Sequence, residues 1–294
     1  MIEPGSPEWL QIITPSKVAA ILGVSRWESP YRLWHRMKGL VPPEPPADRF
    51  DVGHAAEQML AELWRIQNPT WQLSRGEVQI RNDSFGFPTL ATIDGRARRG
   101  ALRRVVEFKS ARTLDDMEMW GDDFTGDVPA DYFAQLQWQM HVTEYTDYAA
   151  HLLAMGPYFK HRTYVVGYEP DLAMLIEEKC RTFHASLLAD EPPDLDDSVP
   201  TYECVRQLNP NLEDRDAEID PQLAADFLDA DREYRALEAE YRGLKTRILD
   251  AMGNARNGLT GDLKVARRQN NGKGSISLYA NKKTPTDQLR ELIA

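Results

Sequence analysis

The sequence predicts an α/β protein of the α+β type, because helical, extended and again helical patterns follow one another along its 294 residues. Helix signals prevail at first, five strand-like segments come next, and a long helical pattern follows near the C-terminus. With 42% hydrophobic residues, the chain can bury a sizeable core. We expect one main domain over residues 1–200 and a C-terminal region of helix and basic strands over residues 201–294.

Two short helices with clear start and stop signals are predicted near the N-terminus. The first has Thr14 as N-cap, Pro15 at the first helical position and Gly23 as its stop. The stretch Ser29–Gly39 repeats this pattern of cap, proline and terminal glycine. The segment Pro42–Pro46 then predicts a stiff, extended linker or loop.

A third helix is predicted to begin near Gly53. Its apolar residues recur at helical spacing and form one buried stripe of Ala56, Leu60, Leu63 and Trp64. Glu57 lies beside that stripe. A carboxylate in this place either forms a salt bridge at the edge of the core or reaches over the sheet as a ligand.

Strands and further helices are predicted in the middle of the chain. The strands are Glu77–Arg81, Phe87–Ile93, Arg104–Ser110, Tyr148–Met155 and Arg162–Tyr168. One helix runs from about Asp131 to Thr143 and another from about Asp171 to Leu188. In the first of these, Gln135 and Gln139 are four residues apart and share a face. Their amides can bind a base, a phosphate or a water, or they can simply face solvent.

The most informative motif is Asp94-Gly95, followed after a short basic turn by Glu107-Phe108-Lys109. In a strand, side chains alternate faces, so Glu107 and Lys109 point the same way. If the strand that ends at Asp94 pairs with this one, two carboxylates and an ammonium converge. Such a group can hold Mg²⁺ and a water against a phosphodiester. The alternative is an ordinary hairpin with an Asp-Gly turn and solvent-exposed charges.

The charge is distributed unevenly. The net charge of −11 argues against a nucleic-acid partner, but fifteen acidic residues and three arginines lie together between Ala189 and Glu233. By contrast, Arg96–Lys109 holds six basic residues against one acid, and Arg256–Lys283 holds seven against one. Each basic stretch is either a phosphate-binding surface or a solvated one. The candidate DNA-binding residues in them are Arg98, Arg99, Arg103, Arg104, Lys264, Arg267 and Arg268.

The C-terminal region begins after a boundary at Asp190–Pro200. A continuous helix is predicted from Pro221 to Met252, with an apolar seam typical of a coiled coil or of a helix packed on its own domain. The seam consists of Phe227, Tyr234, Leu237, Tyr241, Leu244, Ile248 and Met252. Gly253, Gly258 and Gly261 are expected to end the helix and turn the chain into a hairpin of basic strands, Leu263–Arg268 and Ser275–Tyr279.

Several classes of protein are disfavoured. The only cysteines, Cys180 and Cys204, cannot build a disulfide framework, a four-thiolate zinc site or an iron–sulfur cluster. No apolar run approaches the length that spans a bilayer, and the N-terminus lacks the features of a signal peptide. We therefore expect a cytoplasmic protein with no membrane partner.

Taken together, these segments resemble the YqaJ-like viral recombinase family, relatives of phage lambda exonuclease within the PD-(D/E)xK nucleases. The resemblance runs from about Trp9 to Ala154. It rests on Ile13–Gly23, Ser29–Trp34, Gly53 with Glu57, Asp94-Gly95, Glu107–Lys109 and Tyr132–Met140, in that order. It implies a restriction-endonuclease-like core, in which helices flank a central mixed sheet.

The resemblance also implies an activity: a Mg²⁺-dependent exonuclease that degrades linear double-stranded DNA from its 5′ end. Its single strands would serve homologous recombination in a bacterial or phage-infected cell. We expect that Mn²⁺ can substitute for Mg²⁺ and that each site holds two ions. By motif, the metal ligands would be Glu57, Asp94, Glu107 and the carbonyl of Phe108, while Lys109 would position the water.

Other residues take roles from the same resemblance. Gln135 would be an active-site residue. Gln139 is taken as a candidate DNA contact from its place on the same helix face and not from the resemblance. Ser16 would meet the terminal phosphate, but the Arg that usually precedes this Ser is absent from Trp9–Ser16, so a 5′-phosphate preference stays open.

The resemblance further implies a ring-like homotrimer and a single-strand annealing protein as partner. Two alternatives remain: a structure-specific or restriction-type endonuclease on the same core, and a catalytically idle DNA-binding protein.

Overall fold

The computed structural model describes residues 1–42, 48–115, 119–271 and 274–293, without the side chains of residues 48–52. The chain forms two compact units, Met1–Leu212 and Glu213–Ala294. Each unit has a sheet of its own. Of the described helices, none is long and apolar enough to cross a membrane.

Three helices begin the first unit: α1 (Pro7–Leu10), α2 (Pro15–Ile21) and α3 (Pro30–Met37). The start and stop signals of α2 and α3 are confirmed. The Ser29 hydroxyl accepts a hydrogen bond of 3.1 Å from the backbone N–H of Arg32. Gly23 and Gly39 follow the two helices with φ of +71° and +72°, which the sterics of other residues disfavour.

The next helix, α4 (Asp48–Gln67), begins earlier than the expected start near Gly53. Its predicted stripe is confirmed, since Ala56, Leu60 and Trp64 are buried and Leu63 is half-buried. The predicted linker Pro42–Pro46 lies outside the described residues except for Pro42.

The central sheet has the strand order β1-β4-β5-β6-β7. Its strands are β1 (Gln72–Leu73), β4 (Gly95–Arg99), β5 (Leu102–Ser110), β6 (Ala150–Met155) and β7 (His161–Val166). Only the β5–β6 pair among these described strands is parallel, so the sheet is mixed, as predicted. A separate antiparallel pair, β2 (Val78–Arg81) and β3 (Leu90–Ile93), leads into it.

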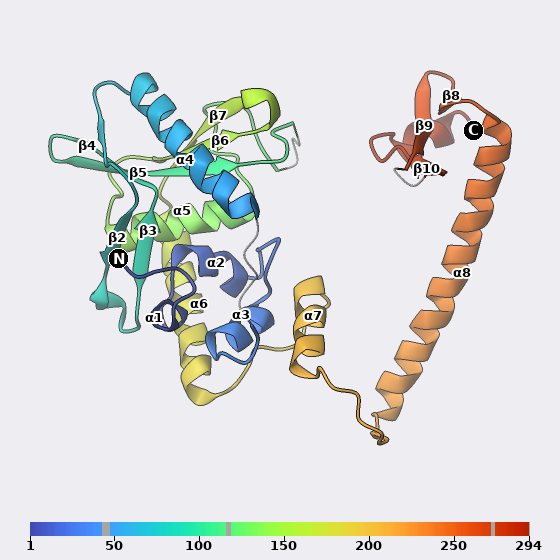
Figure 1. Ribbon diagram of the computed structural model, residues 1–294, viewed down its shortest axis with the longest axis horizontal. Coiled ribbons are helices and arrows are strands. Elements are labelled where there is room, and N and C mark those ends of the chain that lie inside the picture. The colour runs from blue at the N-terminus through green and yellow to red at the C-terminus, as the bar shows by residue number, and fades with distance from the viewer. Residues whose placement is uncertain (43–47, 116–118, 272–273, 294) are drawn as a thin grey trace. The chain divides into compact units, whose positions relative to one another are not determined.

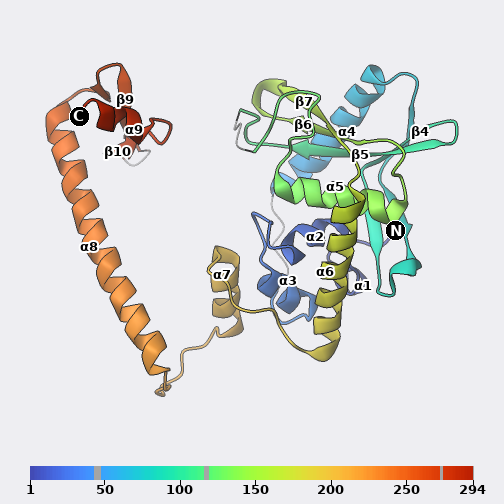
Figure 2. The same ribbon diagram turned by 180° about the vertical axis from the view of Figure 1, so that it is seen from behind.

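Helices cover both faces of this sheet (Figures 1 and 2). α4 lies on one face, over a core that includes Leu60, Trp64, Val106 and Phe108. On the other face lies α5 (Ala130–Thr143), and α6 (Pro170–Ala189) packs with α2 and α5. The helix α7 (Val199–Leu208), which the sequence did not indicate, packs on α3, where Thr201 donates a hydrogen bond of 2.7 Å to Ser29. The first unit therefore continues past residue 200.

The short basic turn expected after Asp94 is wrong. Gly95–Arg99 forms β4, and the chain reverses at Gly100, which has a φ of +63°. Gly95 serves close packing, because a Cβ there would lie 2.6 Å from Cδ1 of Leu73 on the neighbouring strand β1. An Asp-Gly pair thus marks a tight strand contact here and not a hairpin turn.

The second unit consists of α8 (Pro221–Met252), the strands β8 (Asn257–Thr260), β9 (Leu263–Asn270) and β10 (Ile276–Ala280), and α9 (Thr286–Glu291). The predicted long helix is confirmed. The predicted hairpin is a three-stranded sheet instead, in the order β10-β9-β8. Gly258 lies inside β8, where a Cβ would come within 3.0 Å of the Met252 sulfur, so this glycine lets helix and strand approach.

Candidate active site

The strand pairing places Asp94 beside Glu107. Gly95 pairs with Val106 in the antiparallel β4–β5 ladder, so Asp94, which directly precedes β4, lies next to Glu107 on β5. The Asp94 carboxylate accepts a hydrogen bond of 2.8 Å from the backbone N–H of Phe108. Lys109 follows on the same face of β5 and donates to Glu107 Oε1 over 2.5 Å. The predicted convergence of two carboxylates and an ammonium is thus present in the structure.

Glu107 is the centre of a hydrogen-bond network. Its side chain is only 2% exposed, and α5 packs over the strand that carries it. Gln135 donates to Oε1 over 2.6 Å, and Gln139, one helical turn later, donates to Oε2 over 2.8 Å. The two amides and the Lys109 ammonium hold the carboxylate in place.

The burial of the Gln139 side chain does not favour the predicted contact of this residue with DNA. Its amide nitrogen also donates to the carbonyl of Thr92 over 3.1 Å. Since both neighbours are acceptors, the NH₂ group must face them, and Oε1 is left buried without a partner. Gln139 therefore positions Glu107, a role that the usual exposure of glutamine conceals at the sequence level.

The acids repel one another. Burial and then the charge of Glu107 raise the pKa of Asp94 well above its ordinary value. Burial also raises the pKa of Glu57, a half-buried residue of α4. The nearby Lys109 ammonium opposes both shifts without cancelling them. Glu57 was expected either to form a salt bridge at the edge of the core or to act as a ligand. Its electrostatic interaction with Lys109 and Glu107 favours a place in this site.

Lys109 is held in its charged form. Burial disfavours the charge, but Glu107 and then Asp94 outweigh it, so the pKa of Lys109 is raised. Its ammonium also lies 5.3 Å from the ring centroid of Tyr132. A protonated amine has no free lone pair, so in this charged form Lys109 orients a water or a phosphate oxygen and does not act as a base.

The oxygen donors at this site suit a hard divalent cation. In the described part of the chain no group of three or more His, Cys, Asp or Glu side chains is already drawn together around a metal position. The donor chemistry nevertheless fits, because two acids with raised pKa values lose their mutual repulsion when a cation binds. Asp94, Glu107, Glu57 and the Phe108 carbonyl would supply the oxygens, and Lys109 would have to leave Glu107 Oε1.

Comparison with known proteins identifies this part of the chain. Residues 8–146 match the sequence model of the YqaJ-like viral recombinase domain. The chain carries a YqaJ-like viral recombinase domain. It is also 23% identical over 278 residues to the uncharacterized protein YqaJ of Bacillus subtilis, a match that covers 88% of this chain and 82% of that protein.

Solved structures of lower similarity were also found. An alkaline exonuclease from Laribacter hongkongensis, LHK-Exo, has a TM-score of 0.49 and 19% identity, and the match covers 63% of this chain and 94% of that one. Its complex with dAMP gives a TM-score of 0.49 and 20% identity, with 63% and 91% coverage.

The other predicted DNA-binding residues of the first unit lie on α2 and on the strands β4 and β5. Ser16 is exposed in the first turn of α2, with its hydroxyl 3.1 Å from that of Thr14. Strand alternation puts Arg98 and Arg103 on the same face as Asp94 and Glu107. Arg99 and Arg104 lie on the opposite face, toward α4. The basic stretch therefore forms two surfaces.

The basic residues of the second unit are also divided between two faces. In β9, Lys264 and Arg268 share the face of the buried Ala266, and Arg267 points the other way. The Arg268 guanidinium donates to the carbonyl of Gly253, at the end of α8. This contact satisfies a helix C-terminus, which makes Arg268 a structural residue as much as a candidate for DNA binding.

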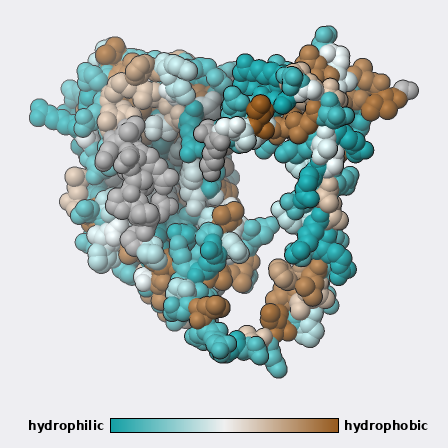
Figure 3. All heavy atoms as spheres, turned by 45° about the vertical axis from the view of Figure 1, so that its right-hand side comes forward, coloured by the Kyte–Doolittle hydropathy of each residue, from teal (hydrophilic) through white to brown (hydrophobic). Residues whose placement is uncertain are grey.

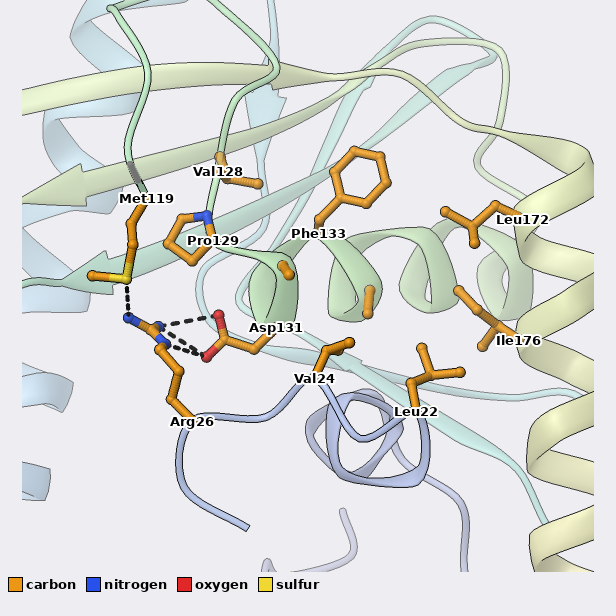
Figure 4. Close-up of a pocket in the computed structure, with 12 residues that line it drawn as sticks. Leu22, Val24, Arg26, Met119, Val128, Pro129, Asp131, Phe133, Leu172 and Ile176 are labelled. Carbon is orange, nitrogen blue, oxygen red and sulfur yellow. Dashed lines mark hydrogen bonds and ion pairs between the residues drawn. The ribbon is translucent and has the colours of Figure 1, made fainter. Parts of the chain in front are cut away.

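A separate pocket of about 640 Å³ opens between the end of α2, the start of α5 and α6. Figure 4 shows its apolar lining, which includes Leu22, Phe133 and Ile176, and the ion pair of 2.8 Å between Arg26 and Asp131 at its border. None of the predicted catalytic residues is among the described residues that line it.

Proposed function

We propose that the chain is a metal-dependent deoxyribonuclease, namely an exonuclease that degrades linear double-stranded DNA in the 5′-to-3′ direction. Its product is single-stranded DNA for homologous recombination of the phage type. The observation that carries the proposal is the convergence of Asp94, which directly precedes β4, with Glu107 and Lys109 on β5, inside a YqaJ-like viral recombinase domain. This group of residues has the chemistry that phosphodiester hydrolysis requires.

Each residue has a distinct role. Asp94, Glu107, Glu57 and the Phe108 carbonyl hold Mg²⁺, or Mn²⁺ in its place, and two ions per site are expected. The bound cation supplies charge neutralisation at the phosphate and a more acidic water. Lys109, which is charged, donates a hydrogen bond to the attacking water or to a phosphate oxygen. Gln135 and Gln139 hold Glu107 in place.

The partners follow from the same proposal. Double-stranded DNA ends are the substrate, and the basic faces of the two units are the candidate phosphate contacts. An annealing protein receives the single strand, and a ring-like homotrimer keeps the enzyme on DNA, because a closed ring cannot dissociate from a strand that it encircles.

The proposal is tested by incubating the purified protein and Mg²⁺ with linear and with covalently closed circular duplex DNA of one sequence. We expect progressive loss of the linear form and an intact circle. Cleavage of the circle would establish the endonuclease alternative instead. Binding of both forms without any cleavage, with Mg²⁺ and with Mn²⁺, would identify an idle DNA-binding protein.

A further inference from the structure

On the α4 face of the sheet, two arginines share one pair of aromatic rings. We call Trp71, Arg99, Arg104 and Tyr148 the Arg–aromatic cluster. The guanidinium carbons of Arg104 and Arg99 lie 4.7 Å and 4.9 Å from the ring centroid of Trp71. The same carbons lie 5.6 Å and 6.0 Å from that of Tyr148. The two rings meet edge to face, with centroids 5.4 Å apart.

The positive charge of this cluster is uncompensated. Among the residues that the structure describes, neither Arg99 nor Arg104 forms an ion pair with a carboxylate. Burial and then the like charge of Arg99 lower the pKa of Arg104. Two neighbouring guanidinium groups without a counter-ion form a site that gains stability when an anion binds.

His151, on β6, contacts Arg104 but cannot satisfy it. Burial and then Arg104 lower the pKa of His151 to about 3, so the imidazole is neutral. Trp64 donates to its Nδ1 over 3.1 Å, and Arg104 Nη1 lies 2.6 Å from its Nε2. Both neighbours are donors only, and a neutral imidazole accepts at one nitrogen. One donor is therefore unsatisfied, and Arg104 Nε is also buried without a partner.

The cluster is accessible and lies near the proposed active site. Arg99 is exposed, and Trp71 and Tyr148 are half-buried. Arg104 precedes Glu107 by three residues on β5, about 10 Å along the strand, and its side chain lies on the opposite face of the sheet, the face that α4 covers and that also carries Glu57.

We propose that the Arg–aromatic cluster binds single-stranded DNA, with phosphates on Arg99 and Arg104 and bases stacked on Trp71 and Tyr148. The inference rests on the proposed function, which leaves one unpaired strand beside the site where the other is degraded. When the guanidinium groups turn to phosphates, the aromatic rings are free to stack with bases. Bases in a duplex are already stacked on each other, so this surface distinguishes a single strand from a duplex.

The test measures DNA binding by the full-length protein in a chelator, so that binding is measured without cleavage. Fluorescence anisotropy compares a labelled oligothymidine with a blunt duplex. We expect Trp71→Ala to weaken binding of the oligothymidine about 5- to 150-fold, which is the loss of one stacked base. Trp71→Phe retains an aromatic face and should keep most of the affinity. Binding of the duplex should change little in either variant.

Arg104→Gln gives a second measurement that does not depend on the packing of Trp71. It should lower the slope of log affinity for oligothymidine against log salt by about 0.7. The matched control is Arg206→Gln, which removes an exposed charge on α7, outside the cluster, and should leave single-strand affinity almost unchanged. Thermal melting of each variant checks the fold.

Equal loss of single-strand and duplex affinity in Trp71→Ala would overturn the proposal and leave a general phosphate-binding patch. Wild-type oligothymidine binding by folded Trp71→Ala and Arg104→Gln proteins would overturn it as well. Neither result depends on cleavage, whereas the proposed function fails if the wild type degrades no DNA with Mg²⁺.

Discussion

At the scale of single residues, the proposed site is organised around one buried carboxylate. Glu107 receives hydrogen bonds from Lys109, Gln135 and Gln139, while Asp94 beside it is held by the Phe108 amide. The Glu-x-Lys spacing predicts that the acid and the base share a strand face. The sequence contains no comparable signal for Gln139, because a glutamine at helical spacing is usually exposed. Its role becomes evident only from the packing of α5 on the sheet.

The first prediction concerns the three central residues. Asp94→Ala, Glu107→Ala and Lys109→Ala should each lower the rate of DNA cleavage by orders of magnitude, because the three side chains act as one unit. The rates should be compared for proteins with wild-type circular dichroism. A folded Lys109→Ala protein with near-normal cleavage would remove Lys109 from the mechanism.

Glu57→Gln should instead raise the Mg²⁺ concentration that cleavage requires. An unchanged Mg²⁺ requirement would make Glu57 a structural carboxylate.

A second prediction separates positioning from DNA contact at Gln139. Gln139→Leu leaves Glu107 Oε2 without its donor, so cleavage should fall about 10- to 100-fold, as for residues that orient metal ligands. DNA affinity measured in chelator should stay at the wild-type level, because the side chain is buried. A loss of affinity in the folded variant, with an unaltered cleavage rate on bound DNA, would return Gln139 to the DNA contacts.

The third prediction is a pH dependence of stability. Because the pKa of Asp94 is raised in the folded protein, its carboxyl keeps the proton at pH values above about 3.9, the pKa of an Asp in the unfolded chain. Its contribution to the free energy of unfolding is therefore fully present below that pH and declines as the pH rises through the folded pKa. In chelator, Asp94→Asn should remove this decline and be more stable than the wild type at neutral pH.

Urea unfolding from pH 4 to 8 measures the difference in the free energy of unfolding between the two proteins. The lowered pKa of His151 makes the stability rise with pH, but this contribution is the same in both proteins and cancels in the difference. Addition of Mg²⁺ should stabilise the wild type and not Asp94→Asn. Identical pH profiles for the two proteins would contradict the electrostatic account of this site.

At the scale of elements, the sequence predicts those helices and strands in which apolar residues recur at regular spacing. The strands β5, β6 and β7 are rich in buried apolar residues, and the 32-residue helix α8 has a clear seam. In contrast, β4 carries three arginines and begins at an Asp-Gly pair, so its sequence indicates a turn. Pairing with β5 and the contact of Gly95 with Leu73 override that local signal. Gly258 likewise indicates a turn in the sequence, but it lies inside β8, where it packs closely against Met252, so the third strand of the sheet in the second unit is not predicted.

A prediction at this scale concerns the two faces of the β4–β5 hairpin. Arg98 and Arg103 lie on the face of the acids, so Arg98→Gln and Arg103→Gln should weaken binding of duplex DNA of any sequence. Each lost phosphate contact should flatten the slope of log affinity against log salt by about 0.9. Arg268→Gln is the contrasting variant, since loss of its contact with Gly253 should lower the melting temperature. An unchanged slope in Arg98→Gln and Arg103→Gln would show that these side chains only face solvent.

At the scale of the whole molecule, the chain joins a YqaJ-like domain to a smaller unit that exposes apolar residues. None of the α8 side chains, all of which are described, is buried, and Phe227, Tyr234 and Leu237 are 69%, 67% and 65% exposed. Figure 3 shows brown and tan side chains among teal ones along this long helix. Such a seam is a candidate contact between copies of the chain.

The oligomer is tested by light scattering at micromolar concentration. We expect a mass of about three times 33.5 kDa. If the seam contributes to the contact, the double variant Leu237→Lys, Leu244→Lys should reduce the mass, whereas Asp229→Lys, off the seam, should not. A mass near 33.5 kDa with and without DNA would exclude the ring.

The most direct test of the account follows nucleotide release from a linear duplex that is labelled at its 5′ ends, with Mg²⁺ present. The wild type should release the labelled nucleotide at once, whereas Lys109→Ala should release almost none. The same duplex labelled at its 3′ ends should lose its label only late. Early release of the 3′ label would contradict the proposed polarity, and equal rates for wild type and a folded Lys109→Ala protein would contradict the proposed active site.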